Sequence, residues 1–190
     1  EPARAEDVPA ALIRAFHIAM TPPMGPCFVS IPVDDWDREC VMPAIAGQCQ
    51  HTLPDPVGIA DLARLIDRAQ RPALILGSGV ATSPGARSAA TELAEKTSAD
   101  IWAAPYAARE TVDELHPRFA GFLPAFRQPL LACLAPYDAL LVIGAPVFTW
   151  HAEGEGPVWP DHAMLGVLSD DPQHLASLPG GLGVLGDPGH

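Results

Sequence analysis

The segment Ala139-Leu-Leu-Val-Ile143, followed by Gly144, is the most apolar stretch of this 190-residue chain. A short, continuous apolar run that ends at a glycine is typical of a strand buried on both faces, as in a parallel sheet covered by helices. Four further runs have the same character, namely Ala73–Leu76, Ile101–Ala104, Met164–Leu168 and Gly183–Leu185. The chain is therefore expected to contain several buried parallel strands.

Amphipathic helices are predicted between these strands. Apolar residues recur at helical spacing in three segments, Ile59–Ile66, Ala86–Lys96 and Gln128–Leu134. Strands that alternate with helices favour a doubly wound, Rossmann-like α/β fold, with a mostly parallel sheet, helices on both faces and right-handed crossovers. Ligands of such folds bind at the carboxyl ends of the strands.

The first third of the chain has a different pattern. Apolar residues spaced four apart predict a helix over residues 8–20, which Asp7 can cap, and the short apolar segment Cys27–Ile31 predicts a buried strand. Residues 33–56 are partly acidic and show no sustained periodicity, so we expect a linker there.

Composition excludes several classes of function. With 11 Lys+Arg against 23 Asp+Glu, the formal net charge is -12, which disfavours binding to nucleic acid or to an anionic membrane. No apolar run is long enough to span a bilayer, and residues 1–10 lack the features of a signal peptide. The four cysteines are irregularly spaced, so reduced thiols in a cytoplasmic protein are expected.

Two absences from the sequence guide the search for a site. The chain begins with Glu1 instead of methionine, which suggests that it starts inside a longer gene product. It also contains no asparagine, which excludes every metal motif with an asparagine amide ligand. Cys40, Cys49 and His51 have no zinc-like spacing, so no metal site is expected.

The turn Gly77-Ser78-Gly79 follows a predicted strand, where a phosphate could sit. The dinucleotide fingerprint is incomplete, because the third glycine is displaced and no acid ends the next strand at Ala104. A plain tight turn is the alternative interpretation.

His151 is the candidate catalytic residue. It follows Val142-Ile-Gly-Ala-Pro-Val-Phe-Thr-Trp150, so the most buried strand delivers an imidazole to its carboxyl-end loop. An imidazole can transfer a proton near neutral pH, and Phe148 and Trp150 could exclude water from it. A structural loop histidine is the alternative.

Several segments resemble the benzoylformate decarboxylases, which are thiamine-diphosphate enzymes of the pyruvate-decarboxylase type. The resemblance rests on Arg14-Ala-Phe-His-Ile-Ala19, Gly25-Pro-Cys-Phe-Val-Ser-Ile-Pro-Val-Asp-Asp-Trp36, His116-Pro117 before Phe119-Ala-Gly121, and Val142-Ile-Gly-Ala-Pro-Val-Phe148 with His151. It implies decarboxylation of an aromatic 2-oxo acid in the full-length enzyme, with His151 in proton transfer. Thr149 replaces an expected basic residue, and Ala152-Glu-Gly-Glu-Gly156 is more acidic than the family pattern.

The resemblance also implies a domain organisation. Residues 1–32 would be the terminal helix and strand of the pyrimidine-binding domain, 33–56 a linker, and 57–190 the central domain, truncated at its C-terminus. Thiamine diphosphate and magnesium would be bound by domains absent here, because the family's Gly-Asp-Gly motif ending in Asn-Asn is missing and Gly186-Asp187-Pro188 does not replace it. The fragment alone is expected to bind no cofactor and to be inactive.

Two alternatives belong to other classes. Related central domains bind FAD or ADP in acetolactate synthases and oxalyl-CoA decarboxylases, and here Gly77, Ser78, Gly79, Gly144 and Asp171 could line such a crevice. A purely structural domain is the other alternative. The expected partners are the remaining domains of the same chain and further copies, as a dimer or tetramer of the full-length enzyme. The orphaned first helix and strand are expected to pack on the central domain or on another copy.

Overall fold

A computed structural model describes residues 1–107, 110–152 and 154–190. The chain divides into two compact units, Glu1–His51 and Thr52–His190, which are described separately below. In the described part of the chain, no helix is both long and apolar enough to cross a membrane.

The second unit contains a single six-stranded sheet in which every pair of neighbouring strands is parallel. Its strand order is β3-β2-β1-β4-β5-β6, the order of a doubly wound dinucleotide-binding fold. The strands are β1 (Pro72–Leu76), β2 (Asp100–Ala103), β3 (Phe119–Phe122), β4 (Ala139–Ile143), β5 (Met164–Ser169) and β6 (Leu182–Leu185). The predicted α/β fold with a parallel sheet is therefore confirmed.

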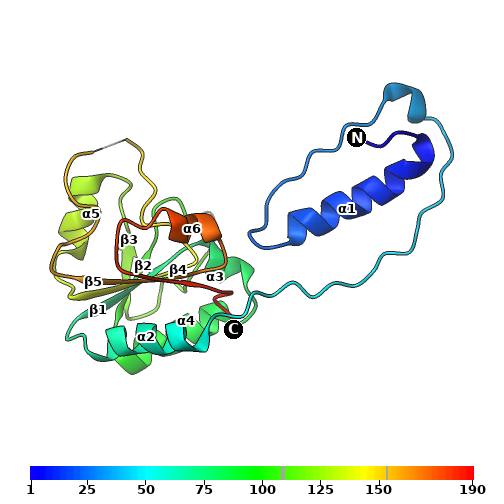
Figure 1. Cartoon of the computed structure of the whole chain (residues 1–190). Helices are drawn as coiled ribbons and strands as arrows, with labels where there is room; N and C mark the ends of the chain where they lie inside the picture. The colour runs from blue at the N-terminus through cyan, green and yellow to red at the C-terminus, as the bar shows by residue number, and fades with distance from the viewer. Residues whose placement is uncertain (108–109, 153) are drawn as a thin grey trace. The chain divides into compact units, whose positions relative to one another are not determined.

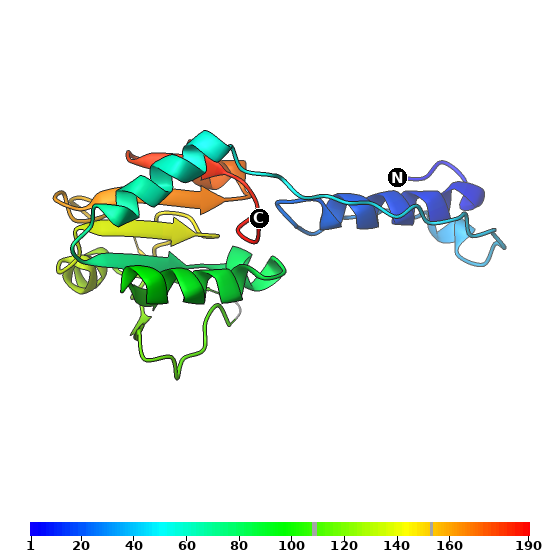
Figure 2. The same cartoon turned by 90° about the horizontal axis from the view of Figure 1, so that it is seen from below.

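Helices cover both faces of this sheet (Figures 1 and 2). One face carries α2 and α4, and the opposite face carries α5 and α6. The helices of the unit are α2 (Pro56–Asp67), α3 (Ser78–Thr82), α4 (Ala86–Thr97), α5 (Arg127–Leu134) and α6 (Pro172–Ala176). The carboxyl ends of all six strands meet at one edge of the sheet, which we call the carboxyl edge, and the opposite edge is the amino edge.

The alternation of side chains along each strand divides the core into two layers. In β1, Leu74 and Leu76 pack in the layer under α2 and α4, whereas Ala73 and Ile75 pack in the layer under α5. The two central strands, β1 and β4, are buried at every position, because helices cover them on both faces. This explains why Ala139–Ile143 carries an apolar residue at each position.

Three elements of the second unit were not predicted, namely α3, β3 and α6. β3 lies in the stretch 105–124, for which no strand was expected, and it is an edge strand whose residues are only half-buried or exposed. A half-exposed strand of four residues that includes Gly121 carries little periodicity to detect. The short helix α6 was also missed, although Asp171 caps it through the amide of Gln173 at 2.8 Å.

The first unit contains the 3-10 helix η1 (Ala5–Asp7), the helix α1 (Val8–Met20) and the 3-10 helix η2 (Val33–Asp35). The carboxylate of Asp7 accepts a hydrogen bond from Arg4 at 3.2 Å and makes no side-chain hydrogen bond to the first turn of α1. The predicted cap by the Asp7 side chain is therefore wrong. The predicted strand at Cys27–Ile31 is wrong, since these residues have no regular secondary structure. A strand needs a neighbour for its backbone hydrogen bonds, and the first unit contains none.

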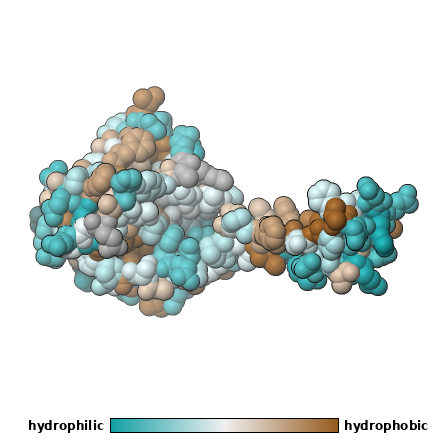
Figure 3. Space-filling model, turned by 90° about the horizontal axis from the view of Figure 1, so that it is seen from above, coloured by the Kyte–Doolittle hydropathy of each residue, from teal (hydrophilic) through white to brown (hydrophobic). Residues whose placement is uncertain are grey.

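Apolar side chains of the first unit lie on its surface (Figure 3). Phe28 is 93% exposed, and Phe16, Ile18 and Trp36 are also largely exposed. Such exposure is typical of a segment whose packing partner is another surface. The expectation that this segment packs on the central domain or on another copy stays a prediction, as do the predicted boundaries at residues 32 and 56.

Candidate functional site

Three loops meet beyond the carboxyl edge of the sheet. Tyr106 follows β2, Phe126 follows β3, and His151 lies on the loop that follows β4. In the strand order β3, β2, β1 and β4 follow one another, so the three loops leave the same half of the carboxyl edge, with β1 between β2 and β4. The candidate site is defined by the side chains of Tyr106, Phe126 and His151.

The loop after β4 is anchored before it reaches His151. Phe148 is only 6% exposed and packs in the core layer under α5, where its ring meets Trp150 edge to face at a centroid distance of 6.1 Å. The backbone amide of His151 donates a hydrogen bond to the carbonyl of Ala125 at 2.9 Å. Phe148 and Trp150 therefore anchor the loop to the core, whereas the imidazole of His151 lies outside the core.

Arg127, the first residue of α5, fastens the same loop beyond His151. Its guanidinium lies 5.0 Å from the ring centroid of Trp150, within the range of a cation–π contact. One terminal nitrogen donates to the carbonyl of Gly156 at 2.5 Å. Glu153, which belongs to the predicted acidic stretch of this loop, lies outside the described residues.

The imidazole of His151 is exposed and makes two defined contacts. Its Nδ1 atom lies 3.0 Å from the hydroxyl oxygen of Tyr106, which is hydrogen-bonding distance. Its ring lies 5.3 Å from the ring of Phe126, measured between centroids, at an interplanar angle of 57°. Within residues 1–107, 110–152 and 154–190, no hydrogen bond is found for Nε2.

The glycine turn Gly77-Ser78-Gly79 lies at the same edge: Gly77 directly follows β1, and Ser78 and Gly79 are the first residues of α3. The amide of Gly77 donates to Ile143 at 2.9 Å, and the amide of Gly79 donates to the carbonyl of Gly144 at 3.0 Å. A Cβ atom on Gly79 would lie 2.7 Å from the Cα of Gly144. These glycines thus permit close packing of the loops that follow β1 and β4, and two of the turn's amides are used inside the domain.

Asp171, the fifth residue of the alternative nucleotide crevice, lies in the loop after β5. Its carboxylate accepts from the amide of Gln173 at 2.8 Å and lies 3.5 Å from His174. His174 in turn shares a 2.8 Å hydrogen bond with the buried hydroxyl of Ser169. Asp171 therefore acts here as a helix cap within a local polar network.

Gly186-Asp187-Pro188 follows β6 and makes several contacts within the second unit. Gly186 packs against Pro54, and the buried carboxylate of Asp187 accepts hydrogen bonds from the hydroxyl of Ser83 and from the amide of Gly189. Burial raises the pKa of the neighbouring Asp170, and the carboxylates of Asp187 and Asp171 raise it further. The hydrogen bond between Asp187 and Ser83 braces the end of β6 against the loop before α4.

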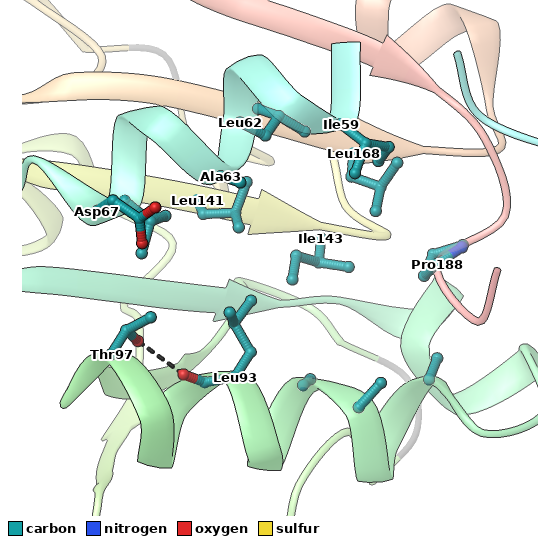
Figure 4. A pocket seen from close by; sticks show the side chains of 14 residues that line it. Ile59, Leu62, Ala63, Asp67, Leu93, Thr97, Leu141, Ile143, Leu168 and Pro188 are labelled. Carbon is teal, nitrogen blue, oxygen red and sulfur yellow. Dashed lines mark hydrogen bonds between the residues drawn. The ribbon is translucent and has the colours of Figure 1, made fainter. Parts of the chain in front are cut away.

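An apolar cavity of about 250 Å³ lies between α2 and α4, over β4 (Figure 4). Leu62 and Leu93 line it from the two helices, and Leu141 and Ile143 form its floor. The hydroxyl of Thr97 at its rim donates to the carbonyl of Leu93 at 2.7 Å. No group of convergent polar side chains marks the described lining as a reaction site.

The remaining histidines of the second unit lie in other surroundings. His116 lies 3.4 Å from Glu95, His174 is hydrogen-bonded to Ser169, His162 lies on the loop before β5 at the amino edge, and His190 is the last residue of the sequence. His151 is accordingly the histidine that the structure brings to the aromatic side chains of the carboxyl edge. Sequence reasoning did not identify Tyr106 and Phe126, because they lie in loops without periodicity or motif.

Comparisons with known proteins agree on one family. Residues 59–190 match the family described as "Thiamine pyrophosphate enzyme, central domain". A benzoylformate decarboxylase from Pseudomonas aeruginosa is 38% identical to this chain over 98% of the chain and 36% of that protein.

Solved structures give the same answer. The structure of a thiamin diphosphate-dependent enzyme from Mycobacterium smegmatis superimposes with a TM-score of 0.87 and 39% identity, over 99% of this chain and 36% of that one. Benzoylformate decarboxylase from Polynucleobacter necessarius gives a TM-score of 0.84 and 34% identity, over 99% of this chain and 35% of that one. The chain therefore spans about a third of the length of these relatives.

Proposed function

The chain belongs to the thiamine pyrophosphate enzymes, and we propose that it is the central part of a longer 2-oxo acid decarboxylase that acts on aromatic substrates such as benzoylformate. In this proposal the sheet is a scaffold, and the loop after β4 contributes one catalytic residue, His151. The proposed boundaries are 1–32 for the end of the preceding domain, 33–56 for a linker and 57–190 for the central domain.

The reaction requires a proton. When a 2-oxo acid loses carbon dioxide, the bond between the carbonyl carbon and the carboxylate breaks, and the carbonyl carbon keeps the electron pair. That carbon must then take up one proton before the aldehyde can leave. A histidine near neutral pH is suited to this transfer, because its imidazole exchanges protons readily between pH 5 and 8.

One observation carries the assignment to His151. The imidazole lies exposed at the carboxyl edge. Its loop is held by Phe148, by the hydrogen bond from the His151 amide to the carbonyl of Ala125, and by Arg127. Ligands of parallel sheets bind at this edge. The aromatic rings of Phe126 and Tyr106 beside the imidazole would suit an aromatic substrate, since ring pairs add favourable contact.

Thiamine diphosphate and magnesium would be held by other domains of the longer protein. The turn at Gly77 packs against Gly144, and Asp187 accepts hydrogen bonds from Ser83 and Gly189, so neither is assigned to the diphosphate or its metal ion in this proposal. The same packing disfavours the alternative of an FAD or ADP site at Gly77–Gly79. We further propose that the longer protein forms a homo-oligomer and acts in the cytoplasm.

The decisive experiment uses the longer protein with thiamine diphosphate and magnesium. Benzaldehyde formation from benzoylformate is followed with alcohol dehydrogenase and NADH. Pyruvate is assayed in the same way as an aliphatic 2-oxo acid for comparison. His151→Ala is expected to lower kcat by about 10²-fold or more, the usual loss on removing a general acid.

His162→Ala is the matched control, because this exposed histidine lies on the same connection between β4 and β5 but just before β5, at the amino edge. It should leave kcat within about twofold of the wild type. Unchanged decarboxylation in His151→Ala would eliminate the catalytic role and leave the domain purely structural. Saturable binding of ADP or FAD to the chain would instead favour a nucleotide-binding domain.

A further inference from the structure

We propose that Tyr106 is a positioning residue for His151: its hydroxyl is hydrogen-bonded to Nδ1, so that Nε2 faces the substrate and transfers its proton when the ring is protonated. This inference rests on the proposed function of His151. It concerns a residue outside the loop after β4, and it specifies which of the two ring nitrogens takes part.

The backbone at Tyr106 supports a fixed position for its side chain. Tyr106 has a φ of 58°, in the left-handed region that residues other than glycine, asparagine and aspartate seldom adopt. Such a conformation persists only when the surrounding structure holds it, and it occurs often at functional sites. The adjacent amide of Ala107 donates to the carbonyl of Ala104 at 3.2 Å and closes this turn directly after β2.

Three contacts together fix the imidazole. The backbone amide of His151 is bonded to Ala125, the ring face is covered by Phe126 at 5.3 Å, and Nδ1 lies 3.0 Å from the Tyr106 hydroxyl. The first contact fixes the start of the side chain and the second limits its tilt. Only the contact with Tyr106 distinguishes Nδ1 from Nε2, so it determines which nitrogen faces outward.

The direction of the hydrogen bond follows from the chemistry of the two groups. A phenol is a good donor but a weak acceptor, because its oxygen lone pair is delocalised into the ring. The unprotonated nitrogen of a neutral imidazole is a strong acceptor. In the neutral ring the favoured arrangement is therefore O–H to Nδ1 with the imidazole proton on Nε2, as second contacts to histidine commonly determine its tautomer. When the ring is protonated, Nδ1–H donates to the phenol oxygen instead, and transfer of the Nε2 proton leaves a neutral imidazole.

The tautomer can be read directly by ¹⁵N NMR of the chain Glu1–His190 at a pH where histidine is neutral. The His151 signals are assigned by their loss in His151→Gln. In the wild type, Nδ1 is expected at the chemical shift of an unprotonated ring nitrogen and Nε2 at that of a protonated one. In Tyr106→Phe, which removes only the hydroxyl, both shifts are expected to move toward the averaged values of free histidine.

Kinetics of the longer protein give a second reading. Tyr106→Phe is expected to lower kcat for benzoylformate about 5- to 20-fold with KM changed less than twofold, because proton delivery is affected and substrate contact is retained. Tyr106→Ala, which also removes the ring, should raise KM in addition. Circular dichroism is the folding control, and Tyr106 is 58% exposed, so both variants should fold.

Two results would overturn the inference. One is an unchanged His151 tautomer in Tyr106→Phe, and the other is a wild type in which Nδ1 carries the proton. Both differ from a failure of the proposed function, which would show as full activity in His151→Ala while the tautomer still responded to Tyr106→Phe.

Discussion

The two edges of the sheet use polar side chains in different ways. At the amino edge, both carboxylate oxygens of Asp138 accept hydrogen bonds, from the amides of Gln70 at 2.8 Å and Arg71 at 2.9 Å. Tyr137 donates to Asp100 at 2.9 Å and accepts from the indole of Trp102 at 3.1 Å. At the carboxyl edge, His151 is exposed and has contacts through Nδ1 and its ring face.

This difference separates structural from chemical roles. The polar groups described at the amino edge form hydrogen bonds to the backbone or to one another. They therefore stabilise the ends of strands. Burial raises the pKa of Tyr137, and its bond to Asp100 raises it further, which keeps this hydroxyl protonated as a donor. The carboxyl edge combines a closed centre at Gly77 and Gly144 with an open half around His151. Three substitutions test this division.

The largest effect is expected at the closed centre of the carboxyl edge. In Gly79→Ala the new methyl group would meet the backbone of Gly144 at 2.7 Å, and backbone atoms cannot move aside as a flexible side chain can. Overpacking of this kind costs about 3 kcal/mol, which corresponds to a loss of about 10 °C in Tm. Thermal unfolding followed by circular dichroism measures it.

Gly47→Ala is the matched control, because a Cβ at Gly47 meets nothing within 4 Å. It should change stability by less than about 0.5 kcal/mol. If Gly79→Ala were equally silent, the turn would have spare room, and a phosphate site there would become plausible again.

A smaller effect is expected at the amino edge. Burial alone would raise the pKa of Asp138, but the hydrogen bonds from Gln70 and Arg71 outweigh it and lower the pKa below the ordinary value of 3.8. The folded state therefore favours the ionised carboxylate, and its stabilisation is present above pH 3.8 and is lost as the pH falls through the lowered pKa. Asp138→Ala should destabilise by about 1 kcal/mol at pH 7, since water can replace part of the bonding.

Urea unfolding at several pH values checks this expectation. The difference between wild type and Asp138→Ala should shrink below pH 3.8, and Asp138→Asn, which keeps one carbonyl acceptor, should lie between the two at pH 7. A difference that stays constant down to the acid limit of folding would show that the carboxylate charge is unimportant.

The smallest effect is a gain in stability at Asp170. Burial and the adjacent carboxylates raise its pKa, so between pH 3.8 and the raised pKa the folded state binds more protons than the unfolded state. Stability therefore falls as the pH rises through this window, and the penalty is complete above it. Asp170→Asn removes the charge and should raise Tm by about 1–2 °C at pH 7, with no gain below pH 3.8.

Asp161→Asn, at an exposed aspartate on the connection before β5, serves as the charge-matched control and should leave Tm unchanged. A loss of stability in Asp170→Asn would mean that the Asp170 carboxylate has a favourable partner that outweighs its burial.

Much of the fold was predictable because burial imposes a pattern. The strands at Ala139–Ile143 and Ala73–Leu76 are covered on both faces, so every residue had to be apolar, and the predicted bounds agree with β4 and nearly with β1. The edge strand β3 is covered less, so its sequence was freer and it was missed. Cys27–Ile31 has a strand-like sequence, yet a strand forms only beside a partner.

The candidate site was predictable only in part. His151 stood out because a buried strand leads to it, and this is a local property of the sequence. Tyr106 and Phe126 reach it across 45 and 25 residues of chain, through the packing of three separate loops. No local pattern encodes such proximity. The left-handed backbone of Tyr106 was also not predictable, because this conformation is usually indicated by a glycine and the residue here is a tyrosine.

The bond from Arg127 to Gly156 has a consequence for how this protein can vary. It divides the long connection between β4 and β5 into two shorter loops, of which the second is held by the indole of Trp159 at the carbonyl of Ala163. The entropy of closing a loop grows with its length, so two tethered loops are each ordered at lower entropic cost than one long loop. Insertions after Gly156 are consequently expected to leave the half of the connection that carries His151 in place.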